Sequence, residues 1–377
     1  MNQAIIKAIL IIFPYFILFS CNAQTPGQEM LTTKKAMDGP YLLYNNDHLR
    51  MIYIDEAGKI SDAQILKPKT PYTFEVHSQE GNHHFGVTLH PIKTQPAHHH
   101  EPAKIFVVSD PHGDFDSFVA ILRAGKVIND QYEWIWGKNH LVVLGDAFDR
   151  GVDVLPILWL CYKLDAEAPT HGGLFHFLIG NHEDLVLAGD KRYMEEKYTR
   201  LERDLTIPYQ ELFSAQTELG QWLRAKNCAI TIGKNLFIHA GLSQSILDRE
   251  KDLQVINNTM QEYLGVGKKN MANKESLPYA LFSSNGPLWY RGMVRDDDKY
   301  EKIDEETIKL IRKTYQVERV IVGHTIFDDI TSFYNQQVIA INVKNRDNRL
   351  AGKGRAILIE NNQVFVVYDN GELKTLE

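Results

Sequence analysis

The sequence predicts a layered α/β domain preceded by a small β-rich region, and three observations support this fold class. Short apolar runs, each followed at once by Asp, Asn or His beside a glycine, are typical of buried strands whose ends carry polar side chains. Helical patterns of apolar residues alternate with these runs, as in sheets that are covered by helices. Before residue 100 the pattern changes to short alternating runs between turn residues, which predict β-hairpins.

The N-terminal residues have the features of an export signal. Ala8–Phe19 is almost wholly apolar, which is the length of a signal-peptide core and short for a membrane span. Leu18–Cys21 is similar to the lipobox of bacterial lipoproteins, so we expect residues 1–21 to be a lipoprotein-type signal peptide and residues 22–36 a tether. The alternative is an ordinary secretory signal. We therefore expect an extracytoplasmic, bacterial membrane lipoprotein, facing the periplasm or at the cell surface, held to the membrane by lipid only.

The regions after the tether are expected to fold. Alternating runs between residues 37 and 100 predict a small β-rich appendage made of hairpins. Residues 101–377 are expected to form the main domain, with a charged helical cap at about 184–228 and further helices at 245–283. A strand–turn–strand pattern at 356–368 predicts another hairpin, which we expect either to resemble the N-terminal ones or to complete the main sheet.

Composition and charge limit the classes of function. The chain has 377 residues with 44% hydrophobic content, enough for one large domain with or without a small companion. The net charge of −7 argues against binding to nucleic acid or to an anionic membrane. Of the 3 cysteines, Cys21 is assigned to lipid, and Cys161 and Cys228 are expected to be buried rather than joined in a disulfide. His98–His100, in a proline-bounded linker, and His83–His84 are interpreted as surface histidines without a specific role.

Five apolar runs end in side chains that can bind a metal ion. The central run, Leu141–Leu144, passes through Gly145 and delivers Asp146 to the carboxyl end of a buried strand, where ligands of open α/β sheets collect. A buried carboxylate is costly unless it has a cationic partner. Taken alone, Asp146 is equally well explained as a helix N-cap. The other four strand ends present Asp110 with His112, Asn181, His239 and His324, and the repetition favours a metal site.

The motifs around these residues are similar to those of a known family. They resemble the calcineurin-like metallophosphoesterases, and within them the phosphoprotein phosphatase branch: Asp-Pro-His-Gly at 110–113, Gly-Asp-x-x-Asp-Arg-Gly at 145–151, Gly-Asn-His-Glu at 180–183, His-Ala-Gly at 239–241 and Gly-His-Thr at 323–325. Pro287–Gly292 looks like the bacterial and plant Shewanella-like phosphatases of that branch. The resemblance covers residues 103–345 and implies an αββα sandwich with helical cap insertions.

Two positions depart from the usual pattern of the family. Ser109 stands before the first Asp where the family usually has glycine, and a serine is small enough for us to expect that the strand end accommodates it. Asn342 stands on the strand after Gly-His-Thr where an Asp is common. That Asp supports the ligands in the family, and neither departure removes a ligand.

The resemblance implies a dinuclear metal site with a bridging hydroxide. The first ion would be held by Asp110, His112 and Asp146, and the second by Asp146, Asn181, His239 and His324. Asp146 would then bridge the two ions, which a carboxylate with two oxygens can do. Mixed nitrogen and oxygen ligands suit Mn, Fe or Zn better than Ca or Mg.

The resemblance also implies which residues act on the substrate. His182 would be the general acid for the leaving group, and Asp149 would orient its imidazole. Arg150 and Arg291, together with Asn181, would bind the phosphate, a task that suits the rigid guanidinium fork. For Arg291 the alternative is a surface salt bridge, and for His182 a residue at the start of a helix.

The function expected from these residues is that of a metal-dependent phosphomonoesterase. Its substrate would be a phosphorylated protein, at Ser/Thr, at Tyr or at both, or a small phosphoester. A nucleotide polyphosphate hydrolase of the diadenosine polyphosphate type is the enzymatic alternative, because related phosphoesterases use the same core. An inactive phosphopeptide-binding module is a third reading, disfavoured because all six ligands and the acid are present.

Overall fold

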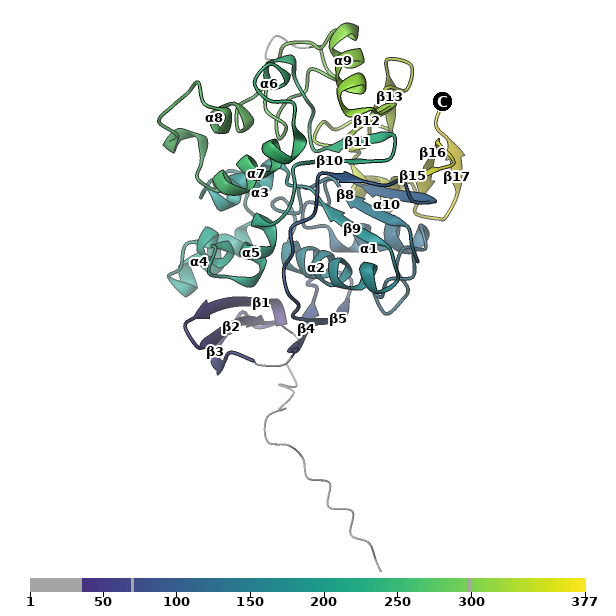
Figure 1. The fold of residues 1–377 in the computed structure, drawn as a ribbon. Coiled ribbons are helices and arrows are strands. Elements are labelled where there is room, and N and C mark those ends of the chain that lie inside the picture. The colour runs from purple at the N-terminus through teal and green to yellow at the C-terminus, as the bar shows by residue number, and fades with distance from the viewer. Residues whose placement is uncertain (1–35, 69–70, 297–299) are drawn as a thin grey trace, which may run out of the picture. The chain divides into compact units, whose positions relative to one another are not determined.

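The computed structural model describes residues 36–68, 71–296 and 300–377 (Figure 1). The expected signal peptide, and the tether except for its last residue, lie outside this part of the chain. Two six-stranded sheets carry the fold, and helices cover their outer faces. The predicted layered α/β fold is therefore confirmed. Within the described ranges, no helix is long and apolar enough to cross a membrane.

The first sheet contains the strands that end in Asp110, Asp146 and Asn181. Its order is β17-β16-β15-β7-β8-β9, and β7 (Lys104–Val108), β8 (His140–Val143) and β9 (Leu174–Phe177) run parallel. The tail supplies β15 (Arg355–Glu360), β16 (Gln363–Tyr368) and β17 (Leu373–Thr375), with β15 antiparallel to β7. Of the two expectations for the tail hairpin, completion of the main sheet is the correct one.

The second sheet contains the strands that end in His239 and His324. Its order is β13-β14-β12-β11-β10-β6, formed by β13 (Thr331–Phe333), β14 (Val338–Ala340), β12 (Arg319–Val322), β11 (Asn235–Ile238), β10 (Ala229–Ile232) and β6 (His98–His99). The interpretation of His98 and His99 as linker residues is wrong, because they pair in parallel with Thr231 and Ile232 of β10.

The two sheets bury one apolar cluster between them, which includes Val107, Val142, Phe237 and Ile321. On its other face the first sheet is covered by α1 (Phe115–Ala124) and α2 (Val154–Thr170), and the second sheet packs with α7 (Leu253–Tyr263) and α9 (Glu305–Tyr315). Strands that are apolar on both faces therefore fit this sandwich, because both faces are buried. Layers in this order are the αββα arrangement that the motifs implied.

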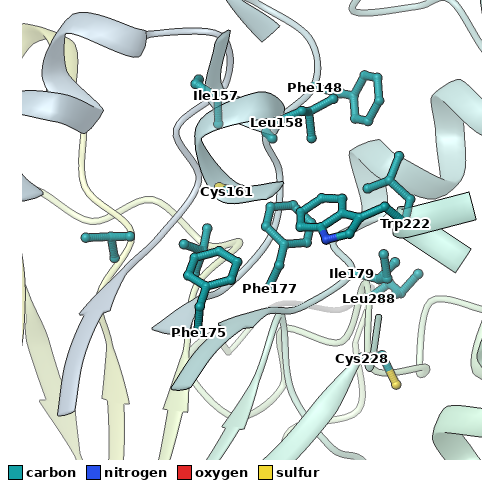
Figure 2. Close-up of a cluster of buried hydrophobic side chains, with 14 of the residues drawn as sticks. Phe148, Ile157, Leu158, Cys161, Phe175, Phe177, Ile179, Trp222, Cys228 and Leu288 are labelled. Atoms are coloured by element: carbon teal, nitrogen blue, oxygen red, sulfur yellow. The ribbon is translucent and has the colours of Figure 1, made fainter. Parts of the chain in front are cut away.

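The remaining helices lie between the strands. The cap region contains α3 (Asn181–Leu187), α4 (Glu196–Leu205) and α5 (Glu218–Arg224), and residues 244–281 contain α6 (Gln244–Leu247) and α8 (Leu277–Leu281) beside α7. Both stretches are helical, as predicted. Figure 2 shows Trp222 of α5 against Phe177 of β9, with ring centroids 5.2 Å apart. Cys161 and Cys228, also in Figure 2, are buried free thiols, as expected.

The N-terminal strands form hairpins and pack on α2. β1 (Ala36–Asn45), β2 (His48–Asp55) and β3 (Ile60–Leu66) make one sheet, and β4 (Thr73–His77) pairs with β5 (His84–Thr88). The indole of Trp159 on α2 donates to the carbonyl of Pro40 at 3.0 Å, and its ring meets Phe74 edge-on at 4.8 Å. The hairpins therefore share the hydrophobic core of the main domain.

Three histidines cluster between the sheets, where β6 comes close to β8 and β9. His140 Nδ1 lies 3.1 Å from His176 Nε2, and the ring of His99 lies 4.5 Å from that of His176, centroid to centroid. Burial lowers the pKa of His140 to about 4 and holds the pKa of His176 well below its ordinary value. Burial also lowers the pKa of His99. At neutral pH the cluster is therefore uncharged.

This cluster should make the fold sensitive to acid. Because the unfolded chain takes up protons near pH 6.5 and the folded His176, whose pKa burial holds well below that value, does not, its contribution to stability is complete above pH 6.5 and is lost progressively as the pH falls below it. His176→Gln should be less stable than wild type at pH 7. The difference between their free energies of unfolding, measured by urea titration, should be about 1 kcal/mol smaller at pH 5.5. His171→Gln, at the exposed end of α2, should follow wild type at both pH values. A deficit independent of pH would contradict the prediction.

Candidate active site

The predicted site residues are brought together by turns of unusual backbone conformation. Non-glycine residues with positive φ include six of them: Asp110, His112, Asp146, Asp149, Arg150 and His324. Such conformations cost of order 1–3 kcal/mol each and concentrate at functional sites. At Gly145 (φ 87°) a Cβ would lie 2.5 Å from the backbone nitrogen of Gly180, so only glycine lets these two motifs approach.

Asp146 lies at the centre of the site and is almost completely buried. Its Oδ1 accepts a hydrogen bond from the backbone N–H of His182 at 2.9 Å. Its Oδ2 lies 3.7 Å from His112 Nε2 and 3.3 Å from His239 Nε2. Although burial raises the pKa of a carboxyl group, His239 and His182 hold that of Asp146 well below its ordinary value. One oxygen of Asp146 is therefore held by a backbone N–H, and the other lies between two imidazole nitrogens.

Two of the predicted histidine ligands have the orientation of metal ligands. His112 Nδ1 lies 2.8 Å from the carbonyl of Phe148, and His239 Nδ1 lies 2.6 Å from that of Leu144. A carbonyl only accepts hydrogen bonds, so each Nδ1 carries the proton and each Nε2 faces Asp146. Burial lowers the pKa of His112 to about 3, which keeps it neutral. Burial would also lower the pKa of His239, but the charge of Asp146 raises it to about 9.

Asn181 and His324 complete the second predicted group of ligands. Asn181 Oδ1 lies 3.0 Å from His239 Nε2. The candidate ligand atoms of Asp146, His239 and His324 lie within 4.8 Å of one another, as do those of Asp146, His112 and His182. His324 Nε2 is buried and has no hydrogen-bond partner among the described residues. A buried imidazole nitrogen left without a partner beside a carboxylate is what a metal-binding residue presents before its ion is bound, so these side chains fit a metal site.

Asp110 lies in the same site but belongs to neither group of closely spaced donors. Its Oδ2 accepts from the Nδ2 of Asn342 at 2.7 Å, and its Oδ1 accepts from the backbone N–H of His324 at 3.2 Å and from the hydroxyl of Ser109. Asn342 therefore supports Asp110, although it replaces the family's usual Asp. Ser109 fits because the residue opposite its hydroxyl is Gly323. Burial raises the pKa of Asp110 to about 6.

The pair expected to act on the leaving group is formed. His182 Nδ1 lies 2.6 Å from Asp149 Oδ2, and both side chains are buried. A carboxylate at this distance fixes Nδ1 as the protonated nitrogen and leaves Nε2 facing the site. His182 Nε2 is 3.5 Å from Arg150 Nη2.

The two arginines lie next to different residues of the predicted site. Arg150 is exposed next to His182, and its backbone N–H donates to the carbonyl of Tyr193 at 3.1 Å. Arg291 is half-buried beside His324, and its Nη1 donates to Thr325 Oγ1 at 2.9 Å. Arg291 Nη1 also lies 3.4 Å from the carbonyl oxygen of His324, so Arg291 borders the predicted site, and its guanidinium has no carboxylate partner among the ion pairs of the described residues.

Glu183 also builds the site, although no role was predicted for it from the sequence. Glu183 accepts hydrogen bonds from the backbone N–H groups of Gly180, Asp146 and Ala147 at 2.7–2.8 Å. It thereby ties the turn after β8 to the turn after β9. Glu183 stands three residues after Gly180, the N-cap of α3. This is the capping-box position, and it was the signal available in the sequence. Burial raises the pKa of Glu183 to about 7.

Comparison with known proteins decides the family. Residues 103–327, more than half of the chain, match the family described as calcineurin-like phosphoesterase. The chain belongs to this family. As a calcineurin-like phosphoesterase it is a hydrolase, which confirms the expectation drawn from its motifs.

Relatives of this phosphoesterase include two Shewanella-like protein phosphatases. Shewanella-like protein phosphatase 1 of Plasmodium berghei is 28% identical over 224 residues, and phosphatase 2 of Arabidopsis thaliana is 24% identical over 287 residues. The matches cover 59% and 64% of this chain and 61% and 71% of those proteins. The resemblance to this branch is confirmed.

A solved structure agrees over most of the phosphoesterase. The crystal structure of the cold-active protein-tyrosine phosphatase of a psychrophilic Shewanella species is 31% identical, with a TM-score of 0.78. The match covers 90% of this chain and 99% of that one. The common fold therefore includes the N-terminal hairpins as well as the two sheets.

Proposed function

We propose that this phosphoesterase is a phosphoprotein phosphatase with a dinuclear metal site, acting on phosphotyrosine and on phosphoserine or phosphothreonine. The observation that carries the proposal is the convergence of donors on Asp146, whose Oδ2 faces His112 on one side and His239 on the other. Phosphatase relatives, one described as a protein-tyrosine phosphatase, support it.

The two ions would be held as the motifs imply. Asp110, His112 and Asp146 would hold one, and Asp146, Asn181, His239 and His324 the other. Mn, Fe or Zn suits these nitrogen and oxygen donors. Metal ions bound in such a site activate a water molecule and neutralise phosphate charge during an in-line displacement.

The remaining side chains would bind the phosphate and move the proton. Arg150 lies beside His182 and Arg291 beside His324, and both guanidinium groups, together with Asn181, would bind the phosphate oxygens. His182 would donate the proton from Nε2 to the leaving oxygen. Asp149, 2.6 Å from Nδ1, would hold the ring in position and stabilise its charged form.

Parallel assays test this function against its alternatives. The purified enzyme, loaded with Mn, should release phosphate from a phosphotyrosine peptide and a phosphoserine peptide of the same sequence. A dinucleotide polyphosphate should be a poor substrate, with a kcat/KM well below those of the peptides. Preference for the dinucleotide would instead assign the enzyme to nucleotide hydrolysis. Peptide binding without turnover would make it a binding module.

We also propose that the enzyme acts outside the cytoplasm, anchored by lipid on Cys21. The support is the sequence Leu18–Cys21 at the end of an apolar run. Since each buried CH₂ contributes about 0.8 kcal/mol, stable anchoring requires more than one acyl chain. Cys21→Ser should release the protein from the membrane fraction or block its processing, while the purified catalytic domain keeps its specific activity. If wild type and variant are both cleaved and equally soluble, the signal is an ordinary secretory one.

A further inference from the structure

A cavity of about 290 Å³ opens beside Asp110 and Arg150. Because these residues line it, the cavity begins where a phosphoryl group held by Arg150 would lie. Its inner wall is apolar and includes Phe118 and Ile121 of α1 together with Val343. This volume is just below the range for pockets that enclose drug-sized ligands, about 300–1,000 Å³. An apolar cavity of about 150 Å³ can hold benzene, so there is room here for an aryl group attached to the phosphate.

The outer wall is the start of α10 (Asn345–Leu350), which two ion pairs hold in place. Arg346 Nη2 lies 2.8 and 2.9 Å from the two carboxylate oxygens of Glu80, in the turn between β4 and β5. Arg349 pairs with Asp116 of α1. The position of this wall therefore depends on a residue of the N-terminal hairpins.

The same β4–β5 turn also contacts the loop that carries Arg150. The backbone N–H groups of Gln79 and Glu80 donate to the two carboxylate oxygens of Asp153, at 2.6 and 3.0 Å. Asp153 is three residues after Arg150, and its own N–H donates to the carbonyl of Gly113 at 3.0 Å. The turn therefore contacts two parts of the cavity wall: it contacts α10 through Glu80, and it contacts the loop of Arg150 through Asp153.

We propose that this cavity is the leaving-group subsite and that it takes the aromatic ring of phosphotyrosine. The inference rests on the proposed phosphoprotein phosphatase function and adds the residues that set its selectivity. An aromatic ring buries its faces against Phe118 and Ile121, whereas a phosphoserine side chain leaves the cavity unfilled. Glu80 and Arg346 are positioning residues, because they hold the outer wall.

The test compares a phosphotyrosine peptide, a phosphoserine peptide of the same sequence and phenyl phosphate, which has no peptide backbone. Ser117→Phe, which fills the cavity, should raise KM for both aryl substrates at least ten-fold and leave kcat/KM for phosphoserine within two-fold.

Two further variants test the wall. Glu80→Gln should raise KM for both aryl substrates and leave kcat unchanged. Arg50→Gln, which breaks a similarly exposed pair with Asp62 between β2 and β3, should change neither constant. Equal losses on tyrosine and serine substrates in Ser117→Phe, at an unchanged Tm, would overturn the subsite. Should Ser117→Phe fail to fold, the smaller Ser117→Leu replaces it, and equal losses on the tyrosine and serine substrates overturn the subsite in the same way. Wild type that hydrolyses neither peptide would instead refute the proposed function.

Discussion

Asp146→Asn is expected to abolish turnover and to lower the metal content of the purified protein from two ions toward one or none. The reason is that Asp146 Oδ2 faces the ligands of both predicted ions, while its Oδ1 is already engaged by the backbone of His182. An amide at this position keeps the size of the side chain and one acceptor, but loses the charge and the second oxygen. Metal content, by elemental analysis, and phosphatase activity are measured on the same sample.

Asp184→Asn provides a matched control for this substitution. Asp184 is a buried carboxyl group on α3, it accepts from the backbone N–H of Gly265, and burial raises its pKa to about 7. Because its side chain is not among the proposed ligands, this variant should retain both ions. An Asp146→Asn enzyme with two metals and full activity would remove Asp146 from the bridging position.

His182→Asn is expected to keep both metal ions while kcat falls by roughly 10²-fold or more, the usual scale for loss of a general acid. The loss should be smallest with nitrophenyl phosphate, whose leaving group needs little protonation, and largest with phosphoserine peptides. Asp149→Asn should show the same dependence on the leaving group with a smaller loss, because it removes only the partner of Nδ1. Equal losses on good and poor leaving groups would argue against an acid role for His182.

Much of the site was predictable because its chemistry is local in sequence. Asp110, Asp146, Asn181, His239 and His324 each follow a short apolar run, and the parallel strands of each of the two sheets place such ends at one edge. The alternation of strands and helices likewise predicted the layers, and the tail hairpin was recognised from its own turn residues. Patterns within ten residues therefore predicted the fold class, and they brought out the side chains that the structure places together as proposed ligands.

The residues that hold these ligands were less predictable, because their partners are distant in sequence. Asn342 supports Asp110 from 232 positions away, and the amides of Gln79 and Glu80 reach Asp153 across more than 70 residues. No periodicity or spacing records such contacts. The pairing of His98 and His99 with β10 was missed for the same reason, since a two-residue strand has no alternation to detect.

The position of β15 has a consequence for the order in which the protein can be built. β7, which leads to Asp110, is paired with β8 on one side and on the other with β15, at residues 355–360. While the ribosome is still adding those residues, one edge of β7 remains open to strands of other chains. A nascent or truncated chain that stops before residue 355 would therefore expose a template for aggregation next to its own catalytic loop. The C-terminal strand β15 is therefore needed to complete the pairing of β7, the first strand of this sheet in the sequence.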